Sequence, residues 1–224
     1  MVKGILKISQ INKIHILNYP LIAFFLILLF FYSAIAKAES YAVATRHHLA
    51  TDIGMNVLKE GGNAIDAAVA VAFALSVVNP SAGNLGGGGF MLIHIAETNE
   101  TLSIDYRERA PINSFEKMFQ DNSGKVIKGL SLNSILASGV PGTVQGMFYA
   151  SEKYGTLDIK SLIDPAINLA REGFVLSGFQ AENLNRYKKK FLKNKEAKKI
   201  FTRPNGFSEG DVLVQTNLAR TLEK

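Results

Sequence analysis

The 224-residue sequence contains no cysteine, and this absence excludes several kinds of chemistry. Without a thiol the chain forms no disulfide, has no thiolate nucleophile, binds no zinc through cysteine and carries no cysteine-linked lipid anchor. The absence is compatible with export into a bacterial periplasm but does not by itself indicate it.

Other patterns that define active sites are also missing. The four histidines show neither H-x₃-H nor H-E-x-x-H spacing, and no G-x-S-x-G motif occurs. His47 and His48 are adjacent and would point apart on a strand. We therefore expect no metal ion, no cofactor and no serine triad.

The basic charge of the chain is concentrated in two places. Residues 1–38 contain four lysines and no acidic residue, so the net charge of +6 falls to +2 without them. A second cluster, from Arg186 to Lys199, has eight basic residues against Glu196 and is expected to form a solvated helix face. Because no aromatic residues alternate regularly with these charges, nucleic-acid binding is not expected.

The N-terminal residues have the pattern of an export signal. Lys3, Lys7 and Lys13 precede an apolar region from Leu21 to Tyr32, and Ala36-Lys-Ala follows. This order predicts a signal peptide over residues 1–38 and a mature periplasmic or secreted domain over residues 39–224. The alternative is an uncleaved membrane anchor, because residues 14–36 come close to the length that spans a bilayer.

Hydrophobic patterning of the mature chain predicts a mixed α+β fold. Asn63 is expected to cap a helix with Asp66 in a capping box, and this helix is apolar on every side and therefore buried. A hairpin packed under such a helix indicates a layered fold, in which helices cover the β-sheet. We expect strands at 41–44, 90–95 and 101–108, and helices at 49–60, 64–78, 144–154, 164–171, 181–199 and from 218 onward.

Five glycines lie between Gly83 and Gly89, directly before the apolar run of residues 90–95, which is expected to be a buried strand. The order helix, glycines, strand is the reverse of a nucleotide-binding fingerprint, and the phosphate-loop lysine is missing. Two interpretations remain open. The glycines permit tight packing where a helix meets a central strand, or their bare backbone lines a site completed by residues elsewhere.

Arg107 is the best polar candidate for substrate binding. It lies near the end of the predicted strand 101–108, whose alternation places it with Ser103 and Asp105 on the face opposite Leu102, Ile104 and Tyr106. A guanidinium group binds a carboxylate through two parallel charge-assisted bonds. The alternative is an ordinary ion pair with Asp105 or Glu108. Thr45 is not expected to be a nucleophile, because nothing around it marks a cleavage point.

Several longer motifs strengthen the interpretation when they are taken together. They are LKEGGNAIDAAVA from Leu58, NP-x-AGNLGGGGFML from Asn79, IDYRERAP from Ile104 and ASGVPGTV-x-G from Ala137. In this order they resemble the N-terminal part of bacterial γ-glutamyltranspeptidase, also called glutathione hydrolase. The resemblance extends over residues 41–224.

The resemblance implies the N-terminal-nucleophile hydrolase fold, a layered αββα sandwich that would be incomplete in this chain. In the family, a precursor cuts itself into a large and a small subunit. The threonine exposed at the start of the small subunit then attacks the γ-glutamyl amide of glutathione, using its own α-amine as base. The glutamyl group passes to water, an amino acid or a peptide.

The family also suggests roles for two features of this sequence. Arg107 matches the arginine of the Asp-(Phe/Tyr)-Arg-Glu motif, which holds the α-carboxylate of the glutamyl group. The glycine run matches a tight passage from helix to strand, and is expected to be architecture near the site without contacting the ligand.

The resemblance places the nucleophilic threonine beyond Lys224, on a small subunit from the same precursor or on a separate chain. The sequence as it stands is therefore expected to be inactive alone. Three interpretations stay open: an incomplete copy of an exported enzyme, half of a split enzyme, and a non-catalytic module that binds γ-glutamyl compounds or another protein.

Overall fold

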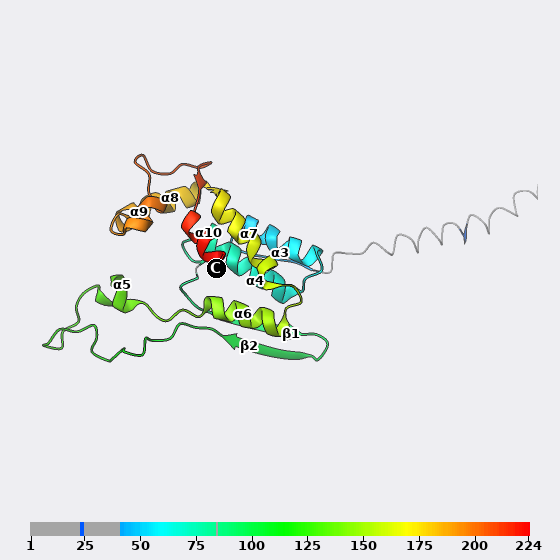
Figure 1. The fold of residues 1–224 in the computed structure, drawn as a ribbon, viewed down its shortest axis with the longest axis horizontal. Coiled ribbons are helices and arrows are strands. Elements are labelled where there is room, and N and C mark those ends of the chain that lie inside the picture. Colours follow the sequence, from blue (N-terminus) through cyan, green and yellow to red (C-terminus); the bar gives the residue numbers. More distant parts are fainter. Residues whose placement is uncertain (1–22, 25–40, 84) are drawn as a thin grey trace, which may run out of the picture. The chain divides into compact units, whose positions relative to one another are not determined.

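The computed structural model describes Ala23, Phe24 and residues 41–83 and 85–224. The chain divides into two units, Met1–Ala42 and Val43–Lys224, and the second unit carries the fold (Figure 1). The predicted signal peptide or anchor lies outside the described residues, apart from Ala23 and Phe24. None of the helices described is both long and apolar enough to cross a membrane.

Helix α4 (Ala64–Val78) is the centre of the core and has the predicted bounds. Asn63 accepts hydrogen bonds from the backbone amides of Ile65 and Asp66, and the Asp66 side chain accepts one from the amide of Asn63. This reciprocal cap confirms the predicted capping box. Helix α4 packs against α3 (His48–Lys59), α6 (Thr143–Tyr154) and α7 (Ile159–Glu172), which explains why it has no polar face (Figure 1).

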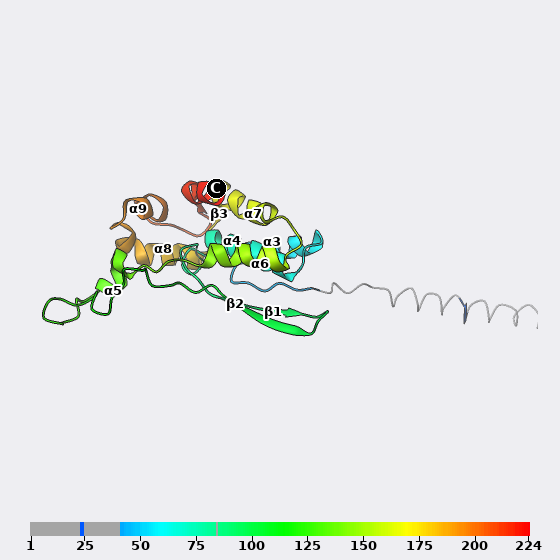
Figure 2. The ribbon, with the colours of Figure 1, turned by 60° about the horizontal axis from the view of Figure 1, so that its bottom comes forward.

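The predicted hairpin is present and pairs β1 (Phe90–Ile95) with β2 (Glu100–Asp105). Ile93 and Ile104 turn toward the helices and are 5% and 9% exposed. The expectation that β1 is buried is wrong for its other face, where Phe90 and Leu92 are 61% and 79% exposed. No element of the described part of the chain covers that face, and Figure 2 shows the hairpin as an outer layer beneath the helices.

Helix α7 begins before the predicted start at Asp164. It runs through Pro165, which lies inside it although proline lacks the amide needed for a helical hydrogen bond. The turns on both sides of Pro165 carry one apolar face, whose buried members include Leu162, Ile163 and Ala166. Burial of this face offsets the lost hydrogen bond, so the sequence-based rule for helix starts gave the wrong boundary.

The charged segment 181–199 is two helices rather than the single predicted one. Helix α8 (Gly178–Phe191) ends at Leu192, and α9 (Lys195–Phe201) starts after Asn194. The Asn194 side chain accepts hydrogen bonds from two amides of the new helix, which is why the chain restarts there.

The remaining differences involve short elements. No strand forms at residues 41–44, because no other strand among residues 41–83 and 85–224 pairs with it. Short helices α5 (Leu130–Asn133) and η1 (Ile135–Ala137) form between β2 and α6, where no helix or strand is predicted. Strands β3 (Phe174–Val175) and β4 (Val212–Leu213) pair antiparallel before the last helix, α10 (Thr216–Leu222), which packs on α7.

Candidate functional site

Arg107 lies just past the end of β2, where the hairpin continues by one more residue pair. The amide of Tyr106 donates to the carbonyl of Gly89 at 3.0 Å, and the amide of Arg107 donates to the Asp105 carboxylate at 3.0 Å. These bonds hold the backbone on either side of Arg107. The predicted alternation is also present, with Leu102, Ile104 and Tyr106 toward the helices and Arg107 exposed on the opposite side.

The guanidinium group of Arg107 is only partly engaged. Its Nε lies 3.4 Å from Oε2 of Glu108, and its Cζ lies 5.8 Å from the centre of the Phe90 ring. The side chain is 62% exposed, and among the described residues no acceptor contacts its two terminal nitrogens. The ion pair with Glu108 therefore exists, yet the pair of donors suited to a carboxylate is available.

A cleft of about 640 Å³ opens beside Arg107. Its walls come from β2, from residues 140–142 and from α6, where Gln145 and Tyr149 reach it. Tyr106 forms its inner side, and burial raises the pKa of the Tyr106 hydroxyl above its ordinary value. The hydroxyl of Tyr106 thus stays neutral at physiological pH.

The glycine run, which leads into β1, contacts both the end of β2 and the start of α6. The carbonyl of Gly87 accepts hydrogen bonds from the amides of Gly142 and Thr143, at 2.8 and 3.1 Å, which ties the run to the start of α6. A Cβ on Gly88 would lie 2.7 Å from the amide nitrogen of Glu108 and still closer to the carbonyl of Tyr106. The packing interpretation of the glycines is therefore confirmed, because side chains would force these backbones apart.

Gly142 gives a test of this packing. A Cβ there would collide with the backbone carbonyl of Tyr106, which cannot rotate away as a side chain could. We expect Gly142→Ala to lower the free energy of unfolding by about 2–3 kcal/mol in urea denaturation. Gly86→Ala is the control, since nothing lies within 4 Å of its added Cβ, and we expect a change of about 0.5 kcal/mol or less. Equal losses in the two variants would contradict the packing argument.

Thr45 and the adjacent histidines have structural roles at the start of α3. The Thr45 hydroxyl bonds the carbonyl of His47 at 2.8 Å, and Nδ1 of His47 accepts from the amide of Leu49 at 3.3 Å as the N-cap. The two histidine rings stack at 4.6 Å, because His47 is the N-cap of α3 and His48 is its first residue, so the two are not neighbours on a strand. Within the described residues no group of three or more His, Asp or Glu side chains could hold a metal ion.

The cap formed by His47 predicts a pH dependence. Burial, and next the neighbouring His48, lower the pKa of His47, against a smaller opposing effect of Gln180. The folded state therefore binds this proton more weakly than the unfolded state, and a protonated Nδ1 could not accept from Leu49. Stability should be complete above about pH 6.5 and decrease as the pH falls below it.

The measurement is the midpoint of urea unfolding between about pH 8 and pH 5.5. His47→Asn keeps a capping side chain that does not titrate, so it should flatten the decrease. The control His94→Gln should leave the decrease unchanged, because exposed His94 contacts only Thr101. A decrease that persists in His47→Asn would assign it to another group.

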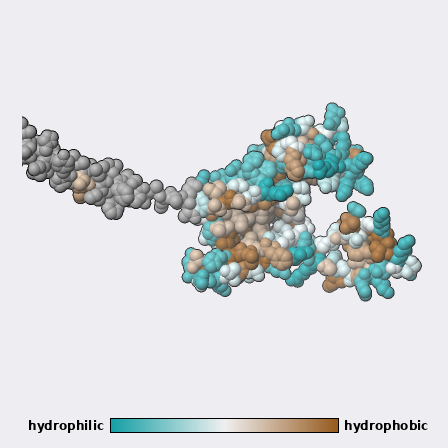
Figure 3. Space-filling model, turned by 180° about the vertical axis from the view of Figure 1, so that it is seen from behind, coloured by the Kyte–Doolittle hydropathy of each residue, from teal (hydrophilic) through white to brown (hydrophobic). Residues whose placement is uncertain are grey.

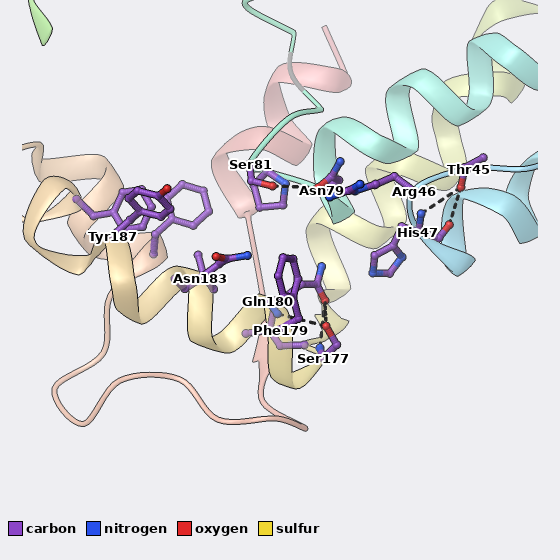
Figure 4. A pocket seen from close by; sticks show the side chains of 15 residues that line it. Thr45, Arg46, His47, Asn79, Ser81, Ser177, Phe179, Gln180, Asn183 and Tyr187 are labelled. Carbon is purple, nitrogen blue, oxygen red and sulfur yellow. Dashed lines mark hydrogen bonds between the residues drawn. The ribbon is translucent and has the colours of Figure 1, made fainter. Parts of the chain in front are cut away.

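A larger cavity, about 760 Å³, lies elsewhere in the second unit (Figure 4). Residues 45–47, residues 79–81, one side of α8 and Phe201 of α9 line it, with Phe179, Gln180 and Asn183 among them. No sequence pattern indicates this cavity, since its walls come from segments that are far apart in the chain. It does not include Arg107.

Comparison with known proteins agrees with the motifs of this site. The family described as Gamma-glutamyltranspeptidase matches residues 50–224. A glutathione hydrolase proenzyme of Pseudomonas sp. strain A14 is 50% identical over 83% of the chain, and one of Escherichia coli is 47% identical over 84%. The chain spans 32% of the length of each, about a third.

A solved structure gives the same result for the fold. The crystal structure of Helicobacter pylori γ-glutamyltranspeptidase matches with a TM-score of 0.80 and 48% identity, over 84% of this chain and 54% of that one. The predicted α+β class and fold are thereby confirmed. Of the expected layers, the described residues supply helices and one hairpin sheet beneath them.

Proposed function

The chain belongs to the γ-glutamyltranspeptidase family, and on that premise we propose that it contributes the carboxylate-binding part of an active site for γ-glutamyl transfer and hydrolysis. The substrate class is glutathione and related γ-glutamyl amides. The observation that carries the proposal is the guanidinium of Arg107, which lies at the edge of a cleft with both terminal nitrogens unengaged by the described residues.

In this proposal Arg107 binds the α-carboxylate of the γ-glutamyl group through two parallel hydrogen bonds. Glu108 contacts the guanidinium through Nε, which leaves the two terminal nitrogens of Arg107, a residue that lines the cleft, available for a substrate. A carboxylate fixed at two points has a defined orientation, so the γ-amide is held at a constant distance from the clamp. The clamp orients the substrate and takes no part in bond cleavage.

We propose that the nucleophile is a threonine on a segment outside these 224 residues, from the same precursor or from a separate chain. Its hydroxyl attacks the γ-carbonyl while the α-amine takes the proton and returns it to the leaving nitrogen. The C–N bond then breaks, which gives a free amine and a γ-glutamyl ester of the threonine. Water, an amino acid or a peptide then accepts the glutamyl group. Thr45 is unsuited to this role, because its hydroxyl is engaged with the carbonyl of His47.

The exposed apolar face of the hairpin is the expected contact surface for a partner segment. Phe90 and Leu92 form an apolar surface next to Arg107, and a sheet face of this kind is normally covered in a layered fold. We propose that the threonine-bearing segment packs against this face. Such packing would bring the nucleophile to the side of the hairpin that carries the clamp.

The export signal belongs to the same proposal. Residues 1–38 would direct the chain out of the cytoplasm and be removed, leaving a domain of residues 39–224 in the periplasm or outside the cell. If the segment were retained, residues 14–36 would anchor that domain to the membrane. Mass determination of the exported chain distinguishes the two, because cleavage after Ala38 removes a defined mass.

The test compares the chain alone with a completed enzyme. In the completed form, residues 43–224 replace the matching part of full-length H. pylori γ-glutamyltranspeptidase, and hydrolysis of γ-glutamyl-p-nitroanilide is measured. We expect no hydrolysis by the chain alone and turnover by the completed form. An inactive but folded and processed chimera would contradict the proposal, and saturable glutathione binding by the chain alone would instead favour a non-catalytic binding module.

A further inference from the structure

The charge of the second unit is strongly asymmetric. Helices α8 and α9 and their connection, residues 178–203, are called the α8–α9 unit below. This unit contains nine basic and two acidic residues. The rest of residues 39–224 contains twelve basic and seventeen acidic residues, so a unit of net charge +7 is attached to a body of net charge −5.

Little of this positive charge is neutralised by contacts. Glu182 pairs with Arg186 at 2.6 Å, Glu196 accepts from Asn217 at 3.1 Å, and Lys188 donates to the carbonyl of Pro204. In the described part of the chain the side chains of five exposed lysines make no ion pair or hydrogen bond. They are Lys189, Lys193, Lys195, Lys198 and Lys199.

The α8–α9 unit packs on the rest of the fold through its apolar residues. Ala181 and Leu184 are buried against the core, and the rings of Phe191 and Phe201 pack at 5.3 Å to join the two helices. These contacts cover the apolar side of the unit, so its charged residues remain on the side that faces solvent. In Figure 3 the unit is the upper right lobe, which is mainly hydrophilic with scattered apolar patches.

The unit also exposes apolar side chains close to its lysines in the chain. Tyr187 and Leu192 are 44% and 47% exposed, and Lys190 lies over the Tyr187 ring at 5.2 Å. Exposed aromatic and leucine side chains combined with lysines are typical of surfaces that enter the headgroup region of a bilayer. A charged helix face that only contacts water has no use for exposed aromatic and leucine side chains.

We propose that the α8–α9 unit docks this protein on an anionic phospholipid surface. Seven of the nine basic residues are lysines, which act as separate point charges and suit a diffuse layer of headgroups better than the paired geometry of a single phosphate site. Each lysine close to an anionic bilayer strengthens binding about fivefold. The negative remainder of the domain is repelled by the same surface, so the unit would meet the membrane first.

The test uses a local probe on the full chain, because residues 14–36 could associate with vesicles of any charge. The sequence has no cysteine, so Leu192→Cys gives a single site for an environment-sensitive dye, and Lys160→Cys on α7 gives a control site. Dye emission is recorded with phosphatidylglycerol-rich vesicles and with pure phosphatidylcholine vesicles. We expect a blue shift at position 192 with the anionic vesicles alone, reversed by high salt, and none at position 160.

Two charge variants complete the test. The first variant should weaken vesicle binding, measured by the dye at position 192, by about 100-fold or more. It combines Lys189→Gln, Lys193→Gln, Lys195→Gln and Lys199→Gln. The matched control replaces four exposed lysines elsewhere and changes the net charge equally: Lys59→Gln, Lys125→Gln, Lys128→Gln and Lys153→Gln. It should retain the response.

Three results would overturn the proposal. They are equal responses to the two lipids, equal loss in the two quadruple variants, or a response to a DNA oligonucleotide without one to vesicles. None of these depends on γ-glutamyl activity, so the proposal and the proposed function fail separately.

Discussion

Asp66→Ala should lower the free energy of unfolding by about 3–5 kcal/mol, more than any other single change considered for stability. The Asp66 carboxylate is fully buried at the start of α4. It accepts hydrogen bonds from the amide of Asn63 at 2.9 Å, from the amide and hydroxyl of Thr156 at 3.0 and 2.6 Å, and from the amide of Leu157 at 3.3 Å.

These contacts make Asp66 a link between distant segments as well as a helix cap. Thr156 lies 90 residues further along the chain, in the connection from α6 to α7, and Asn63 donates to the carbonyl of Tyr154 nearby at 2.7 Å. Alanine would leave several donors without an acceptor and remove the cap of the central helix at once. The expected loss of stability therefore combines the cost of buried unpaired donors with the loss of a helix cap.

Urea denaturation of three variants measures this effect. Asp66→Asn retains one acceptor oxygen and the size of the side chain, so we expect an intermediate loss of about 1–3 kcal/mol. Asp158→Ala is the matched control, because Asp158 precedes α7 without a side-chain capping bond and is exposed. Equal losses of stability in Asp66→Ala and Asp158→Ala would contradict the claim that the buried hydrogen bonds of Asp66 stabilise the fold.

Arg107→Ala should reduce kcat/KM of the completed enzyme by about 10³-fold for γ-glutamyl-p-nitroanilide. Removal of the guanidinium leaves the substrate carboxylate without its two charge-assisted bonds and frees the substrate to rotate. Arg107→Lys keeps the charge but replaces the planar fork by one point donor, so we expect a loss of about 10²-fold.

A substrate control isolates the carboxylate. 4-Aminobutyryl-p-nitroanilide has the same scissile bond and the same amine but lacks the α-carboxylate, so its slow hydrolysis should be almost insensitive to Arg107→Ala. Arg109→Ala is the matched protein control, since its backbone pairs with Val140 independently of the side chain. Equal losses for both substrates would show that Arg107 acts on the fold and would refute its role as the clamp.

The sequence alone determined the elements that depend on neighbouring residues. The bounds of α4 followed from the Asn63 cap, the capping box with Asp66 and the break before Pro80. The hairpin and the alternation around Arg107 followed from period-two patterning. The family followed from long motifs in a fixed order, and these required no knowledge of contacts.

Local signals gave wrong answers where distant packing changed the balance. Asp164 and Pro165 predict a helix start, but α7 continues through Pro165 because its apolar face is buried. The apolar run of β1 predicts a buried strand, whereas only its inner face meets the helices. The sequence reports how apolar a residue is, and the contacts of its element decide whether that residue is covered.

The tertiary structure decided how the site is assembled. Only the folded chain brings Gly87 and Gly142 together behind Arg107, although they are 55 positions apart, and only the fold directs Asp66 onto Thr156. It also separates the 760 Å³ cavity from the clamp and leaves most lysines of α8 and α9 exposed. Capping and periodicity act within about one helical turn, whereas these features depend on backbone contacts between segments whose approach no local pattern encodes.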